Sequence, residues 1–148
     1  MQPFTKITAI AAPFNEANID TNQLCPTRFN KQPRGPQHAK ILFHDLRFNP
    51  DGTEKEFILN RDPYRRAGII VADRNFGVGS ARETAVYALY EFGIRCVIAP
   101  SFGDIFAGNC QNNGLLPVVL PDAAVAEIRR QLGAHRGATL TVDLEAQA

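Results

Sequence analysis

Residues 71–93, VADRNFGVGSARETAVYALYEFG, contain the side chains of this sequence that are best suited to chemistry. An apolar run passes through Gly77 and Gly79 to Ser80 and Arg82, where a helical pattern begins. The free backbone N–H groups at the beginning of a helix attract anions. Arg82 opposes the helix dipole in that first turn, but an arginine can bind a carboxylate through two parallel hydrogen bonds. The segment therefore predicts a site for a carboxylate.

The same segment also has a purely structural interpretation. Ser80 and Glu83 have the spacing of a capping box, in which each side chain accepts a hydrogen bond from a backbone N–H group at the start of the helix. The two roles are compatible, because one serine can cap a helix and face a ligand. A phosphate site is less consistent with the sequence, since the loop lacks the third glycine of GxGxxG and no GxxxxGK[ST] motif occurs.

The elements that must position this loop follow from the apolar patterns of the C-terminal half. The runs AGIIVAD, RCVIAP and LLPVVL lack alternation, which is typical of strands buried on both faces. Helices are predicted over about 80–92, 101–113 and 122–132, the second beginning with Ser101 and Asp104 in capping-box spacing, and TLTVDLEA predicts a last strand. This order predicts an α/β fold with parallel strands and right-handed crossovers. The glycine loop then follows the carboxyl end of a strand, where such sheets place their ligands.

The N-terminal half predicts less regular structure. Residues 6–12 indicate a first strand, NPDG indicates a turn, and EFILN indicates another short strand. Between them, residues 13–37 are rich in proline and asparagine and show little periodicity, so we expect a long loop. A loop of this length in a compact domain is usually functional or mobile.

Composition and charge exclude several classes of protein. The chain has 148 residues, 45% of them hydrophobic and 21% charged, which argues against disorder. A formal net charge of +1 gives no general attraction to nucleic acid or to an anionic membrane, and no apolar run is long enough to span a bilayer. Cys25, Cys96 and Cys110 form no CxxC pair, so we expect no disulfide framework and a cytoplasmic location. Cys96 lies in a predicted strand and is expected in the core, whereas Cys25 lies in the long loop, where it could be exposed.

Four segments of the sequence are recognisable together: ANIDTNQLCPTRF, DRNFGVGSARE, FGIRCVIAPSFGDIF and NNGLLPVVL. In this order and at these spacings, they resemble the small subunits of 3-isopropylmalate dehydratase (isopropylmalate isomerase), of the aconitase superfamily. The resemblance extends over about residues 4–145. It implies a layered β/β/α swivelling domain, a single one over residues 1–148, with an active-site loop at about 13–37. It also implies a large-subunit partner, in a heterodimer or heterotetramer, that carries a [4Fe–4S] cluster.

The reaction of that family isomerises 2-isopropylmalate and 3-isopropylmalate in leucine biosynthesis, by dehydration to isopropylmaleate and rehydration. Such a hydro-lyase needs a Lewis acid for the hydroxyl group, a base for the C–H proton and cations for the carboxylates of its 2-hydroxy dicarboxylic acid. By resemblance, Ser80 is the base, with its alkoxide stabilised by the helix N-terminus and by Arg82, which binds a substrate carboxylate. The other expected substrate-binding residues are Gly79, Ala81, Asp20, Thr21, Asn22 and Arg28.

The resemblance places the cluster and its ligands in the partner, so no metal ligand and no cofactor are expected in this chain. None of the three cysteines is therefore expected to bind metal, and His38, His44 and His135 have no ligand spacing. Because the cluster must approach Ser80, we expect the loops at 20–28 and 75–80 to form part of the contact with the large subunit. The chain alone is then expected to be inactive.

Three residues depart from the family pattern. Asn22 stands where an aspartate is usual, Ala81 replaces the second serine of GSSRE, and Thr84 replaces a common histidine. They leave two alternatives open: the same chemistry on another 2-hydroxy diacid, of the dimethylmalate, citraconate or homocitrate type, or a non-catalytic binding or regulatory paralogue. Ser80 and Arg82 are both retained, which favours an active enzyme.

Overall fold

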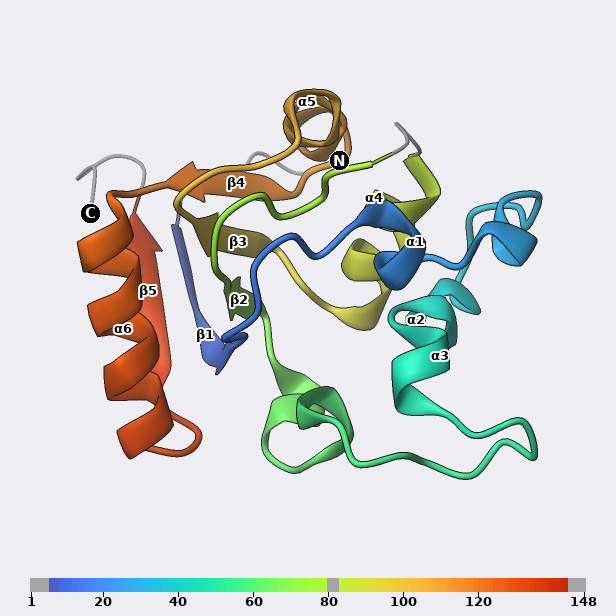
Figure 1. Ribbon diagram of the computed structural model, residues 1–148, viewed down its shortest axis with the longest axis horizontal. Coiled ribbons are helices and arrows are strands. Elements are labelled where there is room, and N and C mark those ends of the chain that lie inside the picture. Colours follow the sequence, from blue (N-terminus) through green and yellow to red (C-terminus); the bar gives the residue numbers. More distant parts are fainter. Residues whose placement is uncertain (1–5, 80–82, 144–148) are drawn as a thin grey trace.

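A five-stranded sheet forms the centre of the molecule, with the strand order β4–β3–β2–β1–β5 (Figure 1). The computed structural model describes residues 6–79 and 83–143. Four of the strands are parallel, and the edge strand β5 runs antiparallel to β1, so the predicted α/β class is confirmed. The strands are β1 (Lys6–Pro13), β2 (Ile69–Val71), β3 (Cys96–Ala99), β4 (Leu116–Val119) and β5 (Thr139–Asp143).

Helices cover both faces of this sheet, as Figure 1 shows for α6 on one side and α4 on the other. Successive side chains of a strand point to opposite faces, so β2 contributes to two separate cores. Ile70 packs in one core with Leu89 of α4, whereas Ile69 packs in the other with Val125 and Leu132 of α6. The long helices are α4 (Glu83–Phe92), α5 (Asp104–Asn112) and α6 (Asp122–Ala134).

Short helical turns from the N-terminal half pack on the α4 side of the sheet, where α1 and α2 contact α4. Their apolar side chains complete the larger core: Leu24, Leu42 and Leu59 have no exposed surface. The turns are α1 (Thr21–Leu24), α2 (His38–Ile41), α3 (His44–Arg47) and 3₁₀ turns at Thr27–Phe29, Ile58–Asn60 and Tyr64–Arg66.

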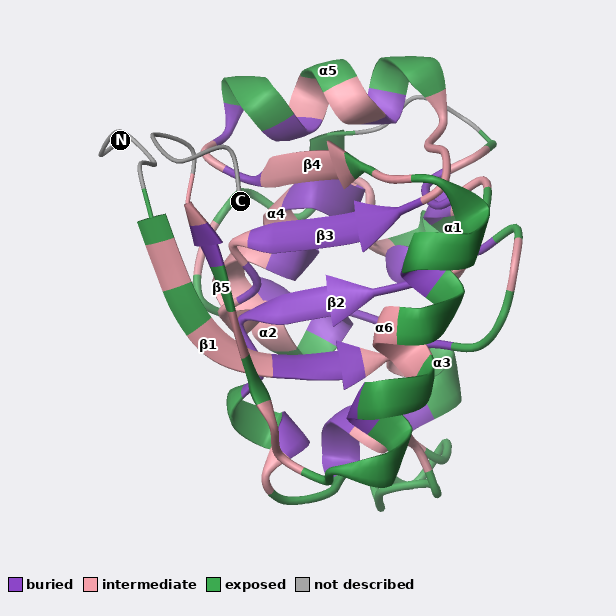
Figure 2. Cartoon of the chain, turned by 90° about the vertical axis from the view of Figure 1, so that its left-hand side faces the viewer, coloured by how far each residue is buried: buried purple, intermediate pink, exposed green. Residues whose placement is uncertain are grey.

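The predictions for the strands after residue 66 are confirmed in position. Gly93, at φ 121°, ends α4 as expected. The prediction that these strands are buried on both faces is confirmed for β2 and β3. It is wrong for β4, because β4 lies at an edge of the sheet and most of its residues are partly exposed (Figure 2). The last helix continues through Gly133 to Ala134, two residues beyond the expected end.

Three predictions of local structure are wrong. Residues 13–37 are not a uniform loop, because α1 and the 3₁₀ turn at 27–29 lie within them. Residues 56–60 form no strand: the Asn60 amide group donates to the backbone carbonyls of Arg47 and Lys55, and this bonding stabilises a 3₁₀ turn. Cys25 is fully buried rather than exposed, because it follows α1 into the core.

The capping box predicted at Ser101 is also wrong. The Ser101 hydroxyl accepts a 2.9 Å hydrogen bond from the Asn75 backbone N–H and donates to Asn75 Oδ1 at 3.1 Å. Because Ser101 is bound to this distant residue, α5 begins only at Asp104, with Gly103 as an N-cap that has no side-chain hydrogen bond.

Candidate functional site

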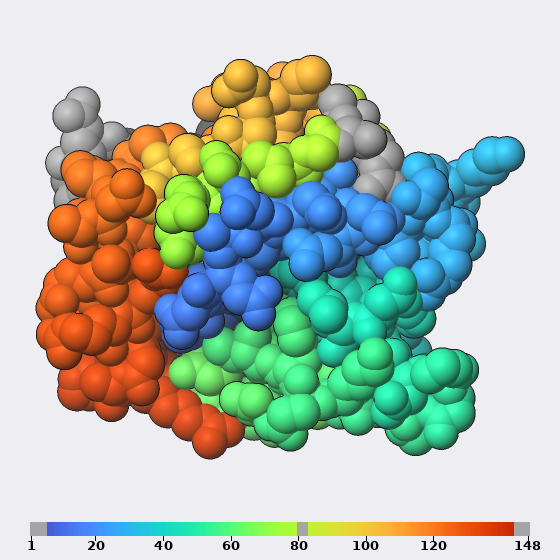
Figure 3. Space-filling model, viewed as in Figure 1, coloured from blue at the N-terminus to red at the C-terminus, as the bar shows by residue number. Residues whose placement is uncertain are grey.

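The structure brings together the two segments in which the sequence predicts a site. Asp20 and Val78 form an isolated parallel bridge, with a 2.9 Å hydrogen bond from the Thr21 backbone N–H to the Val78 carbonyl. A second bond, of 2.7 Å, connects the Gly77 N–H with the Ile19 carbonyl. In Figure 3 the segment at about residues 13–25, in blue, lies directly beside the yellow-green segment at about residues 72–79. Two stretches far apart in the sequence therefore form one continuous surface.

The two glycines of the loop have positive φ angles, +81° at Gly77 and +101° at Gly79, which favour glycine. A Cβ atom on Gly77 would lie 2.3 Å from Cγ of Phe106, so no side chain fits there without displacing α5. A Cβ on Gly79 would lie 3.4 Å from the Thr21 hydroxyl oxygen, an acceptable contact. Gly77 is thus fixed by packing, whereas Gly79 lets the loop pass close to Thr21.

The central residues of the predicted site, Ser80, Ala81 and Arg82, lie outside the described residues. Their roles as base and substrate ligands stay predictions. The described part resumes with α4 at Glu83, whose carboxylate accepts a 2.7 Å hydrogen bond from the Tyr87 hydroxyl. The hydroxyl of Thr84, in the same turn, donates to Asn30 Oδ1 at 3.3 Å.

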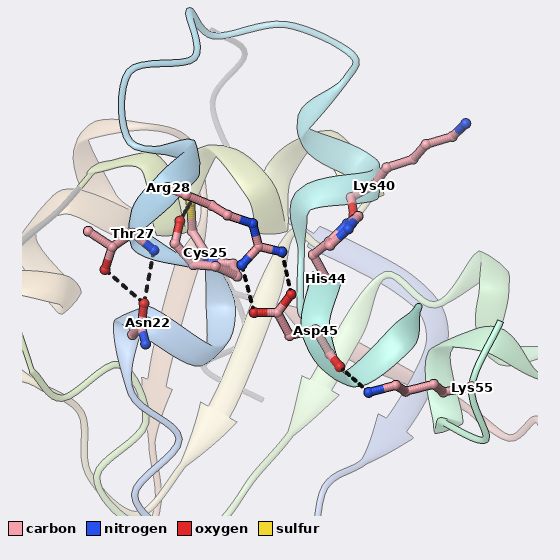
Figure 4. A network of polar contacts seen from close by, with 9 residues as sticks. Asn22, Cys25, Thr27, Arg28, Lys40, His44, Asp45 and Lys55 are labelled. Carbon is pink, nitrogen blue, oxygen red and sulfur yellow. Dashed lines mark hydrogen bonds and ion pairs between the residues drawn. The ribbon is translucent and has the colours of Figure 1, made fainter. Parts of the chain in front are cut away.

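Asp20 and Asn22 both stabilise turns of the neighbouring segment. Asp20 caps α1 by accepting from the Gln23 backbone N–H at 2.8 Å, while the Gln23 side chain accepts from the Asp20 N–H at 3.0 Å. Asn22 Oδ1 accepts from both the N–H and the hydroxyl of Thr27, each at 2.9 Å (Figure 4). Thr21 is buried at 2% exposure. These contacts are local, and a role of the same residues in substrate binding stays a prediction.

Arg28 extends from the 27–29 turn towards α3 (Figure 4). Its guanidinium group donates two parallel hydrogen bonds to Asp45, Nη1 to Oδ2 at 2.9 Å and Nη2 to Oδ1 at 2.5 Å, and it lies 4.6 Å from the centre of the Phe29 ring. These hydrogen bonds hold the pKa of the Asp45 carboxyl group below its usual value. Asp45 was not predicted as a site residue, because no local pattern connects positions 28 and 45.

Arg34 attaches the following part of the loop to α4. Its guanidinium lies 4.8 Å from the Tyr87 ring centre and 5.3 Å from that of Tyr90, and it donates to Asn113 Oδ1 at 3.1 Å. A guanidinium over aromatic rings is attracted by their negative faces. The loop is therefore anchored on both sides of the turn that carries Arg28.

The described residues do not fit an iron–sulfur cluster. Within residues 6–79 and 83–143, no three histidine, cysteine, aspartate or glutamate side chains lie close enough to hold a metal ion. All three cysteines are buried, and no disulfide joins them. Burial raises the pKa of Cys96 to about 12 and also raises that of Cys110, so both thiols are protonated at neutral pH. A thiolate is the form that binds metal, so these two cysteines are poor ligands.

A pocket of about 310 Å³ opens beside the end of β1. Its lining includes the aromatic rings of Phe14, Phe43 and Phe57, and also Glu56 and Arg61, which form an ion pair. None of the predicted site residues lines it, although Ile19 and Gln23, which flank residues 20–22 in the sequence, both do. The pocket therefore borders the N-terminal one of the two loops that form the predicted site. In the described part of the chain, no helix combines the length and apolar character needed to cross a membrane.

Comparisons with known proteins find relatives over almost the whole chain. Residues 1–123 match the family model of the aconitase C-terminal domain. The chain is 51% identical to the 3-isopropylmalate dehydratase small subunit of Cereibacter sphaeroides, over 99% of this chain and 74% of that protein. The chain is 52% identical to the protein of the same name from Gluconacetobacter diazotrophicus, and the match covers 99% of this chain and 72% of that protein. A crystal structure of 3-isopropylmalate dehydratase from Methanocaldococcus jannaschii superposes with a TM-score of 0.68 at 27% identity, over 95% of this chain and 72% of that one.

Proposed function

Because the chain belongs to the aconitase C-terminal domain family, and within it to the 3-isopropylmalate dehydratase small subunits, we propose that it acts as the small subunit of a hydro-lyase in leucine biosynthesis. The reaction interconverts 2-isopropylmalate and 3-isopropylmalate. The observation that carries this proposal is 51% identity over 99% of the chain. The adjacency of the 19–21 segment and the glycine loop supports it, since both predicted parts of the site then lie side by side.

In this proposal, the residues after the glycine loop act on the substrate. Ser80 accepts the C–H proton next to the departing hydroxyl group, and Arg82 binds a carboxylate through paired hydrogen bonds. Backbone N–H groups at the beginning of α4 stabilise the serine alkoxide. The positive φ angles at Gly77 and Gly79 support this arrangement, because they let the loop pass close to Thr21 immediately before Ser80.

The large subunit is the partner that the small-subunit family requires. We place the contact at the loops 20–28 and 75–80, with Asn22 and Arg28 among its exposed side chains. A [4Fe–4S] cluster in the large subunit would supply the Lewis acid for the hydroxyl group. In this proposal, residues 1–148 act as one swivelling domain in the cytoplasm. The ligand is a hydroxy diacid, and neither nucleic acid nor a membrane is a partner.

Anaerobic turnover tests this function. The chain is mixed with the large subunit encoded beside it, after reconstitution of the cluster, and the ultraviolet absorbance of isopropylmaleate is followed from 2-isopropylmalate. We expect a rate that needs both chains and is lost in Ser80→Ala. Thr139→Ala, which removes an exposed hydroxyl on β5, is the matched control and should keep the rate. If the assembled enzyme turned over only a different diacid, 2-isopropylmalate would be the wrong substrate. If Ser80→Ala left the rate unchanged, Ser80 would not be the catalytic base.

A further inference from the structure

We propose that Asp45 is a positioning residue for Arg28, which it fixes so that the opposite edge of the guanidinium group receives a carboxylate of the substrate. The inference rests on the proposed function, because it assigns Arg28 to the same diacid site. It concerns a residue on α3 that lies 17 positions from Arg28 and outside every predicted site segment.

The geometry of the pair leaves one edge of Arg28 available. A guanidinium has five N–H donors in a rigid plane. The Asp45 carboxylate accepts one hydrogen bond from each terminal nitrogen, Nη1 and Nη2. Among the described residues, Asp45 is the only hydrogen-bond acceptor of this group, so Nε–H and one N–H on each terminal nitrogen remain. Nε–H and the adjacent terminal N–H form a second fork that matches a carboxylate.

The backbone that carries Asp45 is held by neighbouring contacts, while the Asp45 side chain is 57% exposed. Its backbone carbonyl accepts a 2.8 Å hydrogen bond from Lys55 Nζ, and it lies between Phe43, at 1% exposure, and Arg47, at 7%. Arg47 donates to the carbonyls of Ala39 and Leu42 at 2.8 and 3.0 Å and thereby fixes the turn that carries Asp45. A carboxylate on such a support can orient a neighbouring group.

The turn that carries Arg28 is attached to both parts of the candidate site. Asn22 accepts two hydrogen bonds from Thr27 on one side, and Asn30 accepts one from Thr84 in the first turn of α4 on the other. The Arg28 side chain is 56% exposed, so a ligand can reach it. Phe29 lies under the guanidinium and packs edge-on against His44, with ring centres 5.1 Å apart, which limits the rotation of the group.

Stability alone gives a weak reason for this pair. Exposed ion pairs contribute little to folding, since water screens the charges and two side chains lose freedom. What two parallel hydrogen bonds provide at a surface is a defined orientation of the guanidinium plane. Orientation is what a binding group for a dicarboxylate needs.

Steady-state kinetics and calorimetric binding on the assembled two-subunit enzyme test the proposal. We expect Asp45→Asn to raise KM and Kd for 2-isopropylmalate about tenfold, the scale of a slightly misplaced binding group, with kcat within about twofold of wild type. In an Arg28→Ala background, Asp45→Asn should have no further effect. Glu127→Gln, which breaks a similar two-bond ion pair with Arg130 on α6, is the control and should change neither constant.

The outcomes separate this inference from the proposed function. Unchanged KM and Kd in Asp45→Asn, or tighter binding because Asp45 competes with the substrate, would overturn the positioning role while the enzyme stays active. A further loss when Asp45→Asn is added to Arg28→Ala would also overturn it, since the two residues would then act separately. If the wild-type enzyme binds another hydroxy diacid instead, the proposed substrate fails, and the same variants are compared on that diacid.

Discussion

The backbone N–H of Thr21 lies 2.9 Å from the carbonyl oxygen of Val78, and this hydrogen bond joins the N-terminal loop to the glycine loop. Because the bond is between main-chain groups, it does not depend directly on the identity of the side chains at positions 21 and 78. It sets the distance between the residues that are expected to bind the diacid and those that are expected to act on it.

Gly77→Ala is expected to destabilise the fold by about 1–3 kcal/mol, because it combines a positive φ with an overpacked contact. The added Cβ would lie 2.3 Å from the Phe106 ring, so the glycine loop or α5 must move. Chemical denaturation measures the loss. Gly52→Ala is the matched control: its φ is +88°, but nothing lies within 4 Å of its Cβ. Equal losses in the two variants would show that strain, and not the Phe106 contact, fixes Gly77.

Asp20→Ala is expected to cost about 1 kcal/mol of stability, since it removes the side-chain cap of α1. Asp20→Asn should preserve stability, because an amide oxygen accepts the Gln23 N–H bond as well. Thermal unfolding of both variants gives the structural effect, and turnover of the assembled enzyme gives the functional one. Loss of turnover in Asp20→Asn at full stability would show that the negative charge itself acts on the substrate or partner.

The three cysteines are expected to resist thiol reagents in the folded chain. Cys25, Cys96 and Cys110 have no exposed surface, and burial raises the pKa of Cys96 to about 12, so little thiolate forms. Labelling followed by mass spectrometry at mildly alkaline pH should give no adduct until denaturant is added. Rapid labelling of one cysteine under native conditions would identify a segment that opens locally.

Acid is expected to remove part of the stability of α6. Hydrogen bonds with Arg130, and then with Gln131, lower the pKa of Glu127 from 4.5 to about 2. A carboxyl group whose pKa is lower in the folded state stabilises the fold above its unfolded pKa, and this contribution is lost as pH falls from about 4.5 to about 2. The difference in unfolding free energy between wild type and Glu127→Gln should therefore shrink across this range.

Arg130→Ala provides the control for that measurement. In its background, Glu127→Gln should have a much smaller effect, because the main cause of the lowered pKa is gone. A wild-type difference that stays constant down to pH 2 would contradict the assignment.

Local pattern was sufficient for the parts of the fold that local residues determine. The unbroken apolar run at Cys96–Ala99 predicted a buried strand, and the order of strands and helices predicted that the glycine loop follows a strand end. Distant partners decided the rest. Ser101 does not cap α5 because Asn75 binds it, and residues 58–60 turn because the Asn60 side chain binds backbone carbonyls at 47 and 55.

The same limit applies to the candidate site. Asp20, Asn22 and Arg28 could be proposed from sequence because they fall in one recognisable segment. Asp45 could not, since its relation to Arg28 exists only after α3 has packed beside the 27–29 turn. The capping box at Asp20 and Gln23 had the required spacing but lay in a segment without an apolar period, so no helix was expected there.

The pairing of β1 with β5 has a consequence for synthesis. Lys6 pairs with Asp143 and Ile10 with Thr139. The partners in this antiparallel ladder therefore come from opposite ends of the described sequence. On the ribosome, β1 emerges early and must wait with one edge unpaired until β5 has been made. Contacts so distant in sequence slow folding, and unpaired edges in the interval favour aggregation. A partner or chaperone that covers β1 during this delay would therefore raise the yield of folded chain.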